Sequence, residues 1–457
     1  MEYQNTLAFA QQLDKEDPLA GFRNEYYLPQ KDGKTLIYLC GNSLGLQPKN
    51  ARAAIEQELN DWATLGVDGH FDGKNPWMYY HHFLNEKAAH VVGANPSEVV
   101  IMNNLTANLH LMMVSFYRPT PARYKILMEA SAFPSDQYAM ETQARFHGFN
   151  PDDAIIELVP REGEYTLRTE DIIAKINAHK NELALVMMGG VNYYTGQAFD
   201  MRAITEAAHA VGAIAGFDLA HAAGNLHLQL HDWNVDFAVW CSYKYLNSGP
   251  GGTSGVFVHE RHGNNPDLPR FAGWWGHDEK ERFKMKKGFK PMQGAAGWQL
   301  SNAQIFPMAI HKASLDLFEE AGMANLRKKS EMLTAYLEYV LNDVINLLSS
   351  RGVSTPLDMT RVVSSSGPDS YRDENSSPES KPFTIITPSN PAERGCQLSI
   401  IVKKDGRKLF DYLQANGILP DWREPDVIRM SPVPMYNSFE EIYKIGETMK
   451  RYFEYGR

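Results

Sequence analysis

A lysine flanked by aromatic residues, Tyr243-Lys244-Tyr245, follows the predicted strand at Phe237–Cys241. An amine that is desolvated at a strand end can form a Schiff base with a carbonyl compound. Asp218 follows another predicted strand, 26 residues before Lys244. A carboxylate buried at such a place needs a cationic partner, which a protonated ring nitrogen would supply and an arginine would supply equally well.

Two further segments could add a phosphate-binding site and an aromatic ring that stacks on a ligand. Asn104 and Thr106 open a predicted helix, where free backbone N–H groups can bind a phosphate, although either residue could simply cap the helix. Phe133 could stack on a heteroaromatic ring or fill the core. Lysine, carboxylate, aromatic ring and phosphate-binding site are together what pyridoxal 5′-phosphate (PLP) requires, because the lysine holds its aldehyde and the carboxylate keeps its pyridine nitrogen protonated.

The elements that must position these residues alternate along the chain. Short apolar runs predict strands and longer patterns between them predict helices, which indicates an α/β fold with a parallel sheet. Ligands of such sheets bind at the carboxyl ends of the strands. The predicted strands are Val99–Met102, Tyr124–Met128, Leu183–Met188, Ala213–Phe217, Phe237–Cys241 and Gly255–His259, and the predicted helices are Asn108–Tyr117, Asp136–Phe146, Thr169–Ala178 and Ala203–Ala210.

Composition argues against several other classes of protein. The 457-residue chain has a net charge of −10, so it lacks the positive field that drives nucleic-acid binding. It has no apolar run of about eighteen residues to span a membrane and no secretory signal pattern. Its three cysteines, Cys40, Cys241 and Cys396, are widely spaced and fit a reducing compartment. We expect a cytoplasmic enzyme without a metal, a membrane partner or a nucleic-acid partner.

Longer strings of residues carry a resemblance to a known family. They are Leu39–Pro48, Phe133–Asp136, Tyr194–Gln197, Gly216–Ala222, Trp240–Asn247, Gly273–His277, Arg282–Met285 and Arg429–Asn437. On these strings the chain resembles the kynureninase family, which belongs to the fold-type-I, aspartate aminotransferase-like PLP enzymes. The likeness runs from about residue 35 to the C-terminus and is broken mainly at a serine-rich segment.

The resemblance implies a fold and a reaction. The fold would have a mainly parallel, seven-stranded sheet in a large domain and a smaller α+β domain at the C-terminus. The enzyme would be a PLP-dependent hydrolase of carbon–carbon bonds in ketonic substances. It would cleave the Cβ–Cγ bond of L-kynurenine or 3-hydroxy-L-kynurenine to give L-alanine and anthranilate or 3-hydroxyanthranilate. This reaction serves tryptophan degradation and the synthesis of the NAD precursor quinolinate.

We expect three parts along the chain. Residues 1–60 would form an N-terminal arm that packs with the small domain, residues 61–310 the large PLP-binding domain, and residues 311–457 the small domain. The small domain would follow a helical stretch at Ile310–Leu348 and contain two strands and a helix, which are Leu398–Val402, Val427–Met430 and Gly406–Ala415. Residues 363–381, rich in serine and acidic side chains, would be a mobile insertion.

The resemblance also implies residue roles. Lys244 would hold the cofactor as an imine, and Lys244 or Tyr243 would act as acid and base. Asp218, with His221 beside it, would face the pyridine nitrogen. The other cofactor-binding residues would be Leu105, Thr106, Phe133, Pro134, Ser135, Asp136, Tyr243, Trp274 and Asn302. Trp274 and Asn302 would come from the neighbouring subunit, which implies a homodimer with shared active sites.

Substrate contacts follow from the same resemblance. The residues that would line the aryl ketone pocket are Ser43, His70, His277 and Asn302. Arg429 would bind the substrate carboxylate, for which a forked guanidinium is the natural partner. His277 and Asn302 could hydrogen-bond a ring hydroxyl, so we expect a preference for 3-hydroxykynurenine. Gly189 stands where relatives often carry Ser or Thr, which removes one hydroxyl near the cofactor.

Three alternatives remain at this point. One is a non-catalytic relative that only binds, which is disfavoured because Lys244, Asp218 and Arg429 are all present. Another fold-type-I enzyme, such as an aminotransferase or a cysteine desulfurase, would share the Asp218 and Lys244 pair. A desulfurase needs a nucleophilic cysteine on a mobile loop, whereas Cys396 precedes a predicted strand. A metal hydrolase could use four residues, which are Asp218, His221, His227 and His231. It would leave Lys244 unexplained.

Overall fold

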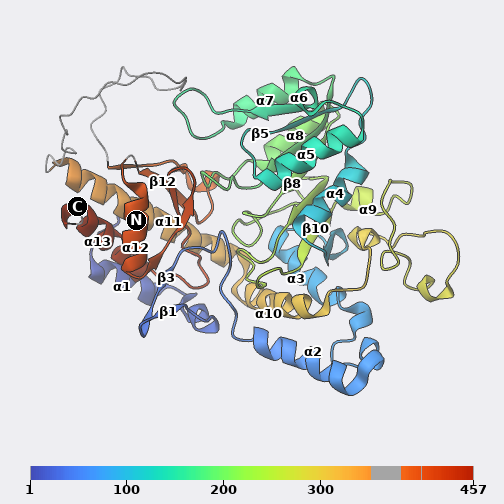
Figure 1. Ribbon diagram of the computed structural model, residues 1–457, viewed down its shortest axis with the longest axis horizontal. Helices are drawn as coiled ribbons and strands as arrows, with labels where there is room; N and C mark the ends of the chain where they lie inside the picture. Colours follow the sequence, from blue (N-terminus) through green and yellow to red (C-terminus); the bar gives the residue numbers. More distant parts are fainter. Residues whose placement is uncertain (1, 351–381, 403, 456–457) are drawn as a thin grey trace, which may run out of the picture.

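The computed structural model describes residues 2–350, 382–402 and 404–455, so the predicted mobile insertion at 363–381 lies outside the described residues. Figure 1 shows a larger unit built on one sheet and a smaller unit that contains both labelled ends of the chain. No helix among the described residues is both long enough and apolar enough to span a membrane.

A seven-stranded sheet organises the larger unit (Figure 1). The antiparallel β10 pairs with β4 and β9, and the other pairings in the sheet are parallel. This confirms the predicted fold class, with a mainly parallel sheet of seven strands. In spatial order the strands are β4 (Val99–Met102), β10 (Ser254–Val258), β9 (Phe237–Trp240), β8 (Ile214–Asp218), β7 (Leu183–Gly189), β5 (Lys125–Glu129) and β6 (Ile155–Leu158).

Alternate residues of these strands enter two different cores, one on each face of the sheet. In β4, Val99 and Ile101 belong to one apolar cluster, while Val100 and Met102 belong to another. This is the period-two pattern of a strand that is buried on both faces. The helices of the larger unit are α2 (Ala51–Leu65), α3 (His82–Val92), α4 (Leu105–Phe116), α5 (Pro134–Phe146), α6 (Pro151–Ala154), α7 (Thr169–Ala178), α8 (Met201–Ala210), α9 (Glu260–Gly263) and α10 (Ile305–Ala321).

The predicted strands and helices of the larger unit are confirmed to within a few residues, but β6 was not predicted. It is a short strand at the edge of the sheet, and Glu157 in its middle is exposed. Its other three residues are apolar, but so short a run directly after α6 cannot be told from a helical segment by periodicity.

The smaller unit contains an antiparallel sheet and three long helices. The sheet order is β11 (Phe383–Ile385), β12 (Leu398–Val402), β15 (Val427–Met430) and β14 (Asp421–Arg423). The helices are α11 (Met323–Ser350), α12 (Gly406–Ala415) and α13 (Phe439–Tyr455). The predicted strand–helix–strand pattern of this unit is therefore confirmed.

The first residues of the chain lie with the smaller unit (Figure 1). Helix α1 (Leu7–Glu16) packs on α13, and the Asp14 carboxylate accepts hydrogen bonds from the first backbone N–H groups of α13. The short β3 (Ile37–Tyr38) pairs in parallel with β13 (Ile418–Leu419). A two-stranded ribbon of β1 (Gln30–Lys31) and β2 (Lys34–Thr35) lies between α1 and β3 in the chain.

The predicted helical stretch Ile310–Leu348 is divided between the two units. Gly322, with a φ of 74°, ends α10 in a conformation that glycine adopts at little cost. Apolar residues through Leu326 belong to the core of the larger unit, whereas those from Leu333 onward belong to the core of the smaller unit. The domain limits at 60 and 310 stay predictions.

Candidate active site

One cavity lies at the carboxyl ends of strands β5, β7, β8 and β9. It brings together predicted site residues from several distant segments, which are Leu105, Thr106, Phe133, Ser135, Asp136, Asp218, His221, Tyr243 and Lys244. Pro134 begins α5 between two of them. The remaining lining residues were not predicted as site residues, and they are Glu129, Gly189, Val191, Tyr193, Ala220 and Cys241.

Lys244 is buried in this cavity, with 9% of its surface exposed. Its Nζ lies 3.0 Å from Nε2 of His221 and 5.6 Å from the centre of the Phe133 ring. An ammonium group can only donate, so Nε2 of His221 is the acceptor and the imidazole is neutral. Burial, and then the charge of Lys244, lower the pKa of His221 well below its ordinary value, which agrees with this assignment.

Two buried carboxyl groups face Lys244. Asp218 ends β8 and accepts a hydrogen bond from the backbone N–H of Ala220 at 2.7 Å. Asp136, in the first turn of α5, shares a hydrogen bond with Asp218. Burial raises the pKa of both groups, and the charge of Asp218 raises that of Asp136 further. Two carboxyls this close favour sharing one proton, which leaves a single negative charge beside Lys244.

The beginning of α4 provides a place for an anion. Asn104 caps this helix by accepting a hydrogen bond from the Ala107 N–H, so the N–H groups of Leu105 and Thr106 are in the first turn of the helix. The hydroxyls of Thr106 and Ser135 lie 2.8 Å apart. Helix N-termini favour negative groups, and two hydroxyls there can donate to phosphate oxygens.

These residues fit PLP. The Phe133 ring offers a flat surface, Lys244 offers the amine, and the carboxyl pair offers the charge that a protonated ring nitrogen needs. Oδ1 of Asp136 is buried and has no hydrogen-bond partner among the described residues. A buried acceptor without a partner is costly, and a donor group on a ligand would satisfy it.

The N-terminal segment reaches the backbone of Lys244, which sequence reasoning did not anticipate. The Gly45 N–H donates to the carbonyl of Tyr243 at 2.8 Å. A Cβ on Gly45 would lie 2.3 Å from the Lys244 carbonyl oxygen and 2.2 Å from Oδ1 of Asn247. Contacts this short cannot exist, so the close approach requires glycine.

Arg429 on β15 is buried but already has partners. Its Nη1 donates to the Tyr193 carbonyl at 2.7 Å, and its Nη2 pairs with Asp421. Ser43 Oγ donates to the same Asp421 carboxylate at 2.8 Å. Only Nε of Arg429 lacks a partner among the described residues. Asp421 and Tyr193 were missed, because the sequence gives no sign that they face Arg429 across distant segments.

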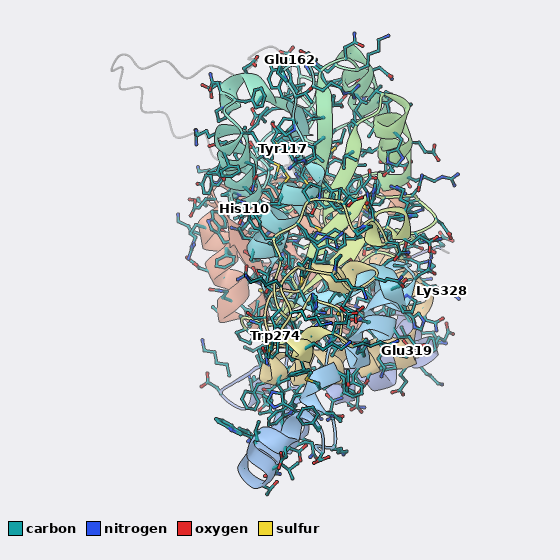
Figure 2. All side chains as sticks on the ribbon, turned by 90° about the vertical axis from the view of Figure 1, so that its right-hand side faces the viewer. His110, Tyr117, Glu162, Trp274, Glu319 and Lys328 are labelled. Atoms are coloured by element: carbon teal, nitrogen blue, oxygen red, sulfur yellow. The ribbon has the colours of Figure 1, made fainter. Side chains whose placement is uncertain are left out.

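The other predicted site residues lie away from the Lys244 cavity within the described chain. Trp274 and His277 line a separate hollow on the connection between β10 and α10, and Trp274 is 43% exposed. Figure 2 labels Trp274 on the side of the molecule that faces the viewer. Asn302 is exposed. His70 contacts the Val67 carbonyl and the edge of the Trp77 ring.

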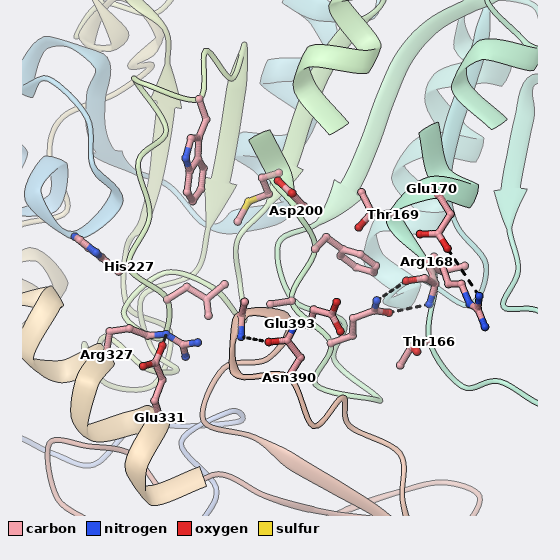
Figure 3. A pocket seen from close by; sticks show the side chains of 18 of the residues that line it. Thr166, Arg168, Thr169, Glu170, Asp200, His227, Arg327, Glu331, Asn390 and Glu393 are labelled. Carbon is pink, nitrogen blue, oxygen red and sulfur yellow. Dashed lines mark hydrogen bonds and ion pairs between the residues drawn. The ribbon is translucent and has the colours of Figure 1, made fainter. Parts of the chain in front are cut away.

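The structure does not support the alternative interpretation as a metal hydrolase. Asp218 and His221 lie with Lys244, but Nδ1 of His231 lies 3.0 Å from the buried carboxylate of Glu98. His227 lines a different cavity, shown in Figure 3. The four proposed ligands therefore do not converge.

The cavity of Figure 3 is larger than the one around Lys244. It lies where several segments meet, and charged and polar side chains make up much of its lining. Its arginines are paired: Arg168 with Glu164 at 2.5 Å, and Arg327 with Glu331 at 2.9 Å. The exposed Arg168 pair contributes little to stability, and both arginines are already occupied by carboxylates of the same chain.

Comparison with known proteins agrees with the site. A model of the aminotransferase class-V family matches residues 37–357, and a model of the kynureninase C-terminal domain matches residues 372–449. The kynureninase of Flavobacterium psychrophilum is 52% identical, with 99% of each chain covered. That of Myxococcus xanthus is 53% identical over 98% of this chain and 97% of its own, and that of Nematostella vectensis 48% over 98% and 94%.

The chain belongs to the kynureninase family. Kynureninases are PLP-dependent hydrolases of carbon–carbon bonds, so the predicted family, activity, enzyme class and cofactor are confirmed. Solved structures show the same fold: the apo cysteine desulfurase of Thermococcus onnurineus superposes with a TM-score of 0.69 at 16% identity, covering 96% of this chain and 97% of its own.

The desulfurase alternative was weighed on Cys396 as its nucleophile, and the structure does not support that role. Cys396 is fully buried, and burial raises the pKa of its thiol to about 12. Such a thiol stays protonated and unreactive at neutral pH. The desulfurase structures therefore share the fold with this chain, and the reaction is that of the family.

Gly45→Ala is expected to reduce cofactor affinity and kcat at least tenfold, although Gly45 lines no part of the cavity. The added methyl would displace the Lys244 backbone, and small displacements of a reacting group are costly. PLP titration followed by absorbance would measure the loss. Gly21→Ala, where a Cβ meets nothing within 4 Å, is the control. Wild-type affinity in Gly45→Ala would contradict this account of the contact.

Proposed function

We propose that this cavity performs the hydrolytic Cβ–Cγ cleavage of L-kynurenine or 3-hydroxy-L-kynurenine, with Lys244 and Tyr243 as its catalytic residues. The observation that carries the proposal is the buried amine of Lys244, held 3.0 Å from a neutral His221 and beside the Asp218 carboxyl. PLP supplies an electron sink for the bond that breaks. The described side chains supply positioning, charge and proton transfer.

Lys244 is suited to move protons between the reacting carbons. Within the described parts of the chain its amine donates to one acceptor, the neutral His221, which keeps the amine directed into the cavity. The Tyr243 hydroxyl is protonated at neutral pH and is the candidate proton donor, although burial raises its pKa. A base and an acid that line one cavity can serve opposite sides of a hydrolytic cleavage.

Substrate binding is assigned to the edge of the cavity near the smaller unit. Arg429 is held by Asp421 and the Tyr193 carbonyl, which leaves its Nε for a carboxylate. Tyr193 also meets Phe133 edge to face, with ring centres 5.4 Å apart. We assign the α-carboxylate of the substrate to Arg429. This places it next to the PLP ring that would stack on Phe133.

A homodimer with shared sites is the arrangement that the exposed surface supports. Several large apolar residues are exposed along the connection between β10 and α10, which are Phe271, Trp274, Phe283, Met285 and Phe289. An apolar surface of this extent is typical of an interface. In a homodimer this segment, with His277 and Asn302, would complete the neighbouring site. The free cysteines support a cytoplasmic location.

Lys244→Ala should abolish activity to the limit of detection, because the variant loses both the amine that holds PLP and the base. Alanine and anthranilate formation from kynurenine measures the effect. Lys408→Ala, which changes an exposed lysine of α12, should retain wild-type activity. Full activity in Lys244→Ala would refute the assignment.

The wild-type enzyme should have the higher kcat/KM for 3-hydroxy-L-kynurenine than for L-kynurenine. A site that hydrogen-bonds a hydroxyl rejects an analogue without it, and we assign that contact to His277 and Asn302. Steady-state kinetics with both substrates, side by side, gives the ratio. An equal or reversed ratio would reduce His277 and Asn302 to a structural role.

Shared sites can be tested by pairing two inactive variants. A mixed dimer of Lys244→Ala and Asn302→Ala would contain one site with both native residues, so co-expression should restore activity. Lys244→Ala paired with Asp218→Ala should stay inactive, since both residues lie in one chain's cavity. Failure of the first pair to regain activity would reject the shared-site dimer.

A further inference from the structure

A third carboxyl group lies in the Lys244 cavity and has no place in the reaction described so far. Glu129 ends β5, lines the cavity, and is 6% exposed. Both of its carboxylate oxygens lie 3.2 Å from the backbone nitrogen of Gly189 at the end of β7. Its donors are two backbone N–H groups, that of Gly189 and its own, and burial disfavours its charged form.

The cavity holds more acidic groups than it can keep ionised. Glu129, Asp136 and Asp218 all line it, and Lys244 is the only lysine or arginine among the described residues of its wall. Asp218 has the best-matched donor, the Ala220 N–H at 2.7 Å. One oxygen of Asp136 has no partner in the described chain. The negative charge is therefore favoured on Asp218, and protons on the other two.

Gly189 creates the environment of Glu129. A Cβ at this position would lie 3.0 Å from Oε1 of Glu129 and 3.4 Å from the Val191 carbonyl oxygen. The absence of a side chain lets the carboxyl reach the backbone N–H of Gly189. Gly189, which lacks the hydroxyl that relatives often carry, thus leaves room for the Glu129 carboxyl against its own backbone N–H.

We propose that Glu129, held against the Gly189 backbone in the wall of the cavity, is a positioning residue whose charge sets how firmly Asp218 holds a protonated ring nitrogen. The proposal rests on the proposed function of this cavity. Asp136 and Asp218 interact electrostatically with Glu129, and the other titratable groups that line the same cavity are Tyr193, His221, Cys241, Tyr243 and Lys244.

The direction of the effect follows from the charges. Burial, and to a lesser extent the charge of Asp218, raise the pKa of Glu129 to about 7, against the lowering effect of hydrogen bonds from the backbone N–H groups of Gly189 and Glu129 itself. Below this pH Glu129 is neutral, and above it the group adds a negative charge beside Asp218. A second negative charge stabilises a positive ring nitrogen, so the nitrogen holds its proton more firmly as the pH rises through neutrality.

The test uses the PLP-loaded enzyme without substrate and follows the absorbance of the bound cofactor across neutral pH. The absorbance of PLP bound to the wild-type enzyme should change in one step whose midpoint lies near pH 7. Glu129→Gln, which is neutral at every pH and has nearly the same shape, should bind PLP and lose this step. Glu141→Gln on α5, an acid outside the cavity, should keep it. An unchanged step in Glu129→Gln would overturn the proposal.

A second variant covers the case in which Glu129→Gln does not bind PLP. Gly189→Ser crowds the Glu129 carboxyl without removing it, so the step should move to a different pH and remain. A step that stays in place in Gly189→Ser would also overturn the proposal. Both measurements need no turnover, so they fail independently of the kynurenine assay that tests the proposed function.

Discussion

The contact between Lys244 and His221 is the interaction around which the cavity is built. A buried ammonium needs an acceptor and a nearby negative charge, and here it has the Nε2 of His221 at 3.0 Å and the Asp218 carboxyl. His221 can accept only because burial keeps its ring neutral. The parallel strands make this possible, since β8 and β9 end side by side and deliver Asp218 and Lys244 to the same edge.

The site also depends on contacts between the two units of the chain. In the N-terminal segment, Gly45 packs against the Lys244 backbone and Ser43 donates a hydrogen bond to Asp421. Asp421 in turn holds Arg429 on β15. The cofactor cavity belongs to the large sheet, while the cation assigned to the substrate belongs to the small one. A relative movement of the two units would therefore change the distance between Arg429 and the reacting centre.

Local sequence patterns predicted the regular strands and helices of the larger unit. The buried runs such as Val99–Met102 show the strand signal on their own, and both of its faces are covered in the structure. The edge strand β6 was missed because its short apolar run is interrupted by Glu157 and follows α6 directly. The break at Gly322 within a helical stretch was missed because glycine alone does not reveal which core each half enters. The pairing of Asp421 with Arg429 joins two strands whose partner choice is a tertiary property.

The sequence by itself determined the chemistry. The residue types at the strand ends, Lys244, Asp218, Phe133 and Thr106, and the longer strings around them specify a PLP enzyme of the kynureninase family. Only the tertiary structure decided how these groups share charge. Whether Asp136, Asp218 or Glu129 keeps a proton depends on burial and on which backbone N–H each can reach, and those distances arise when strands far apart in the chain are packed together.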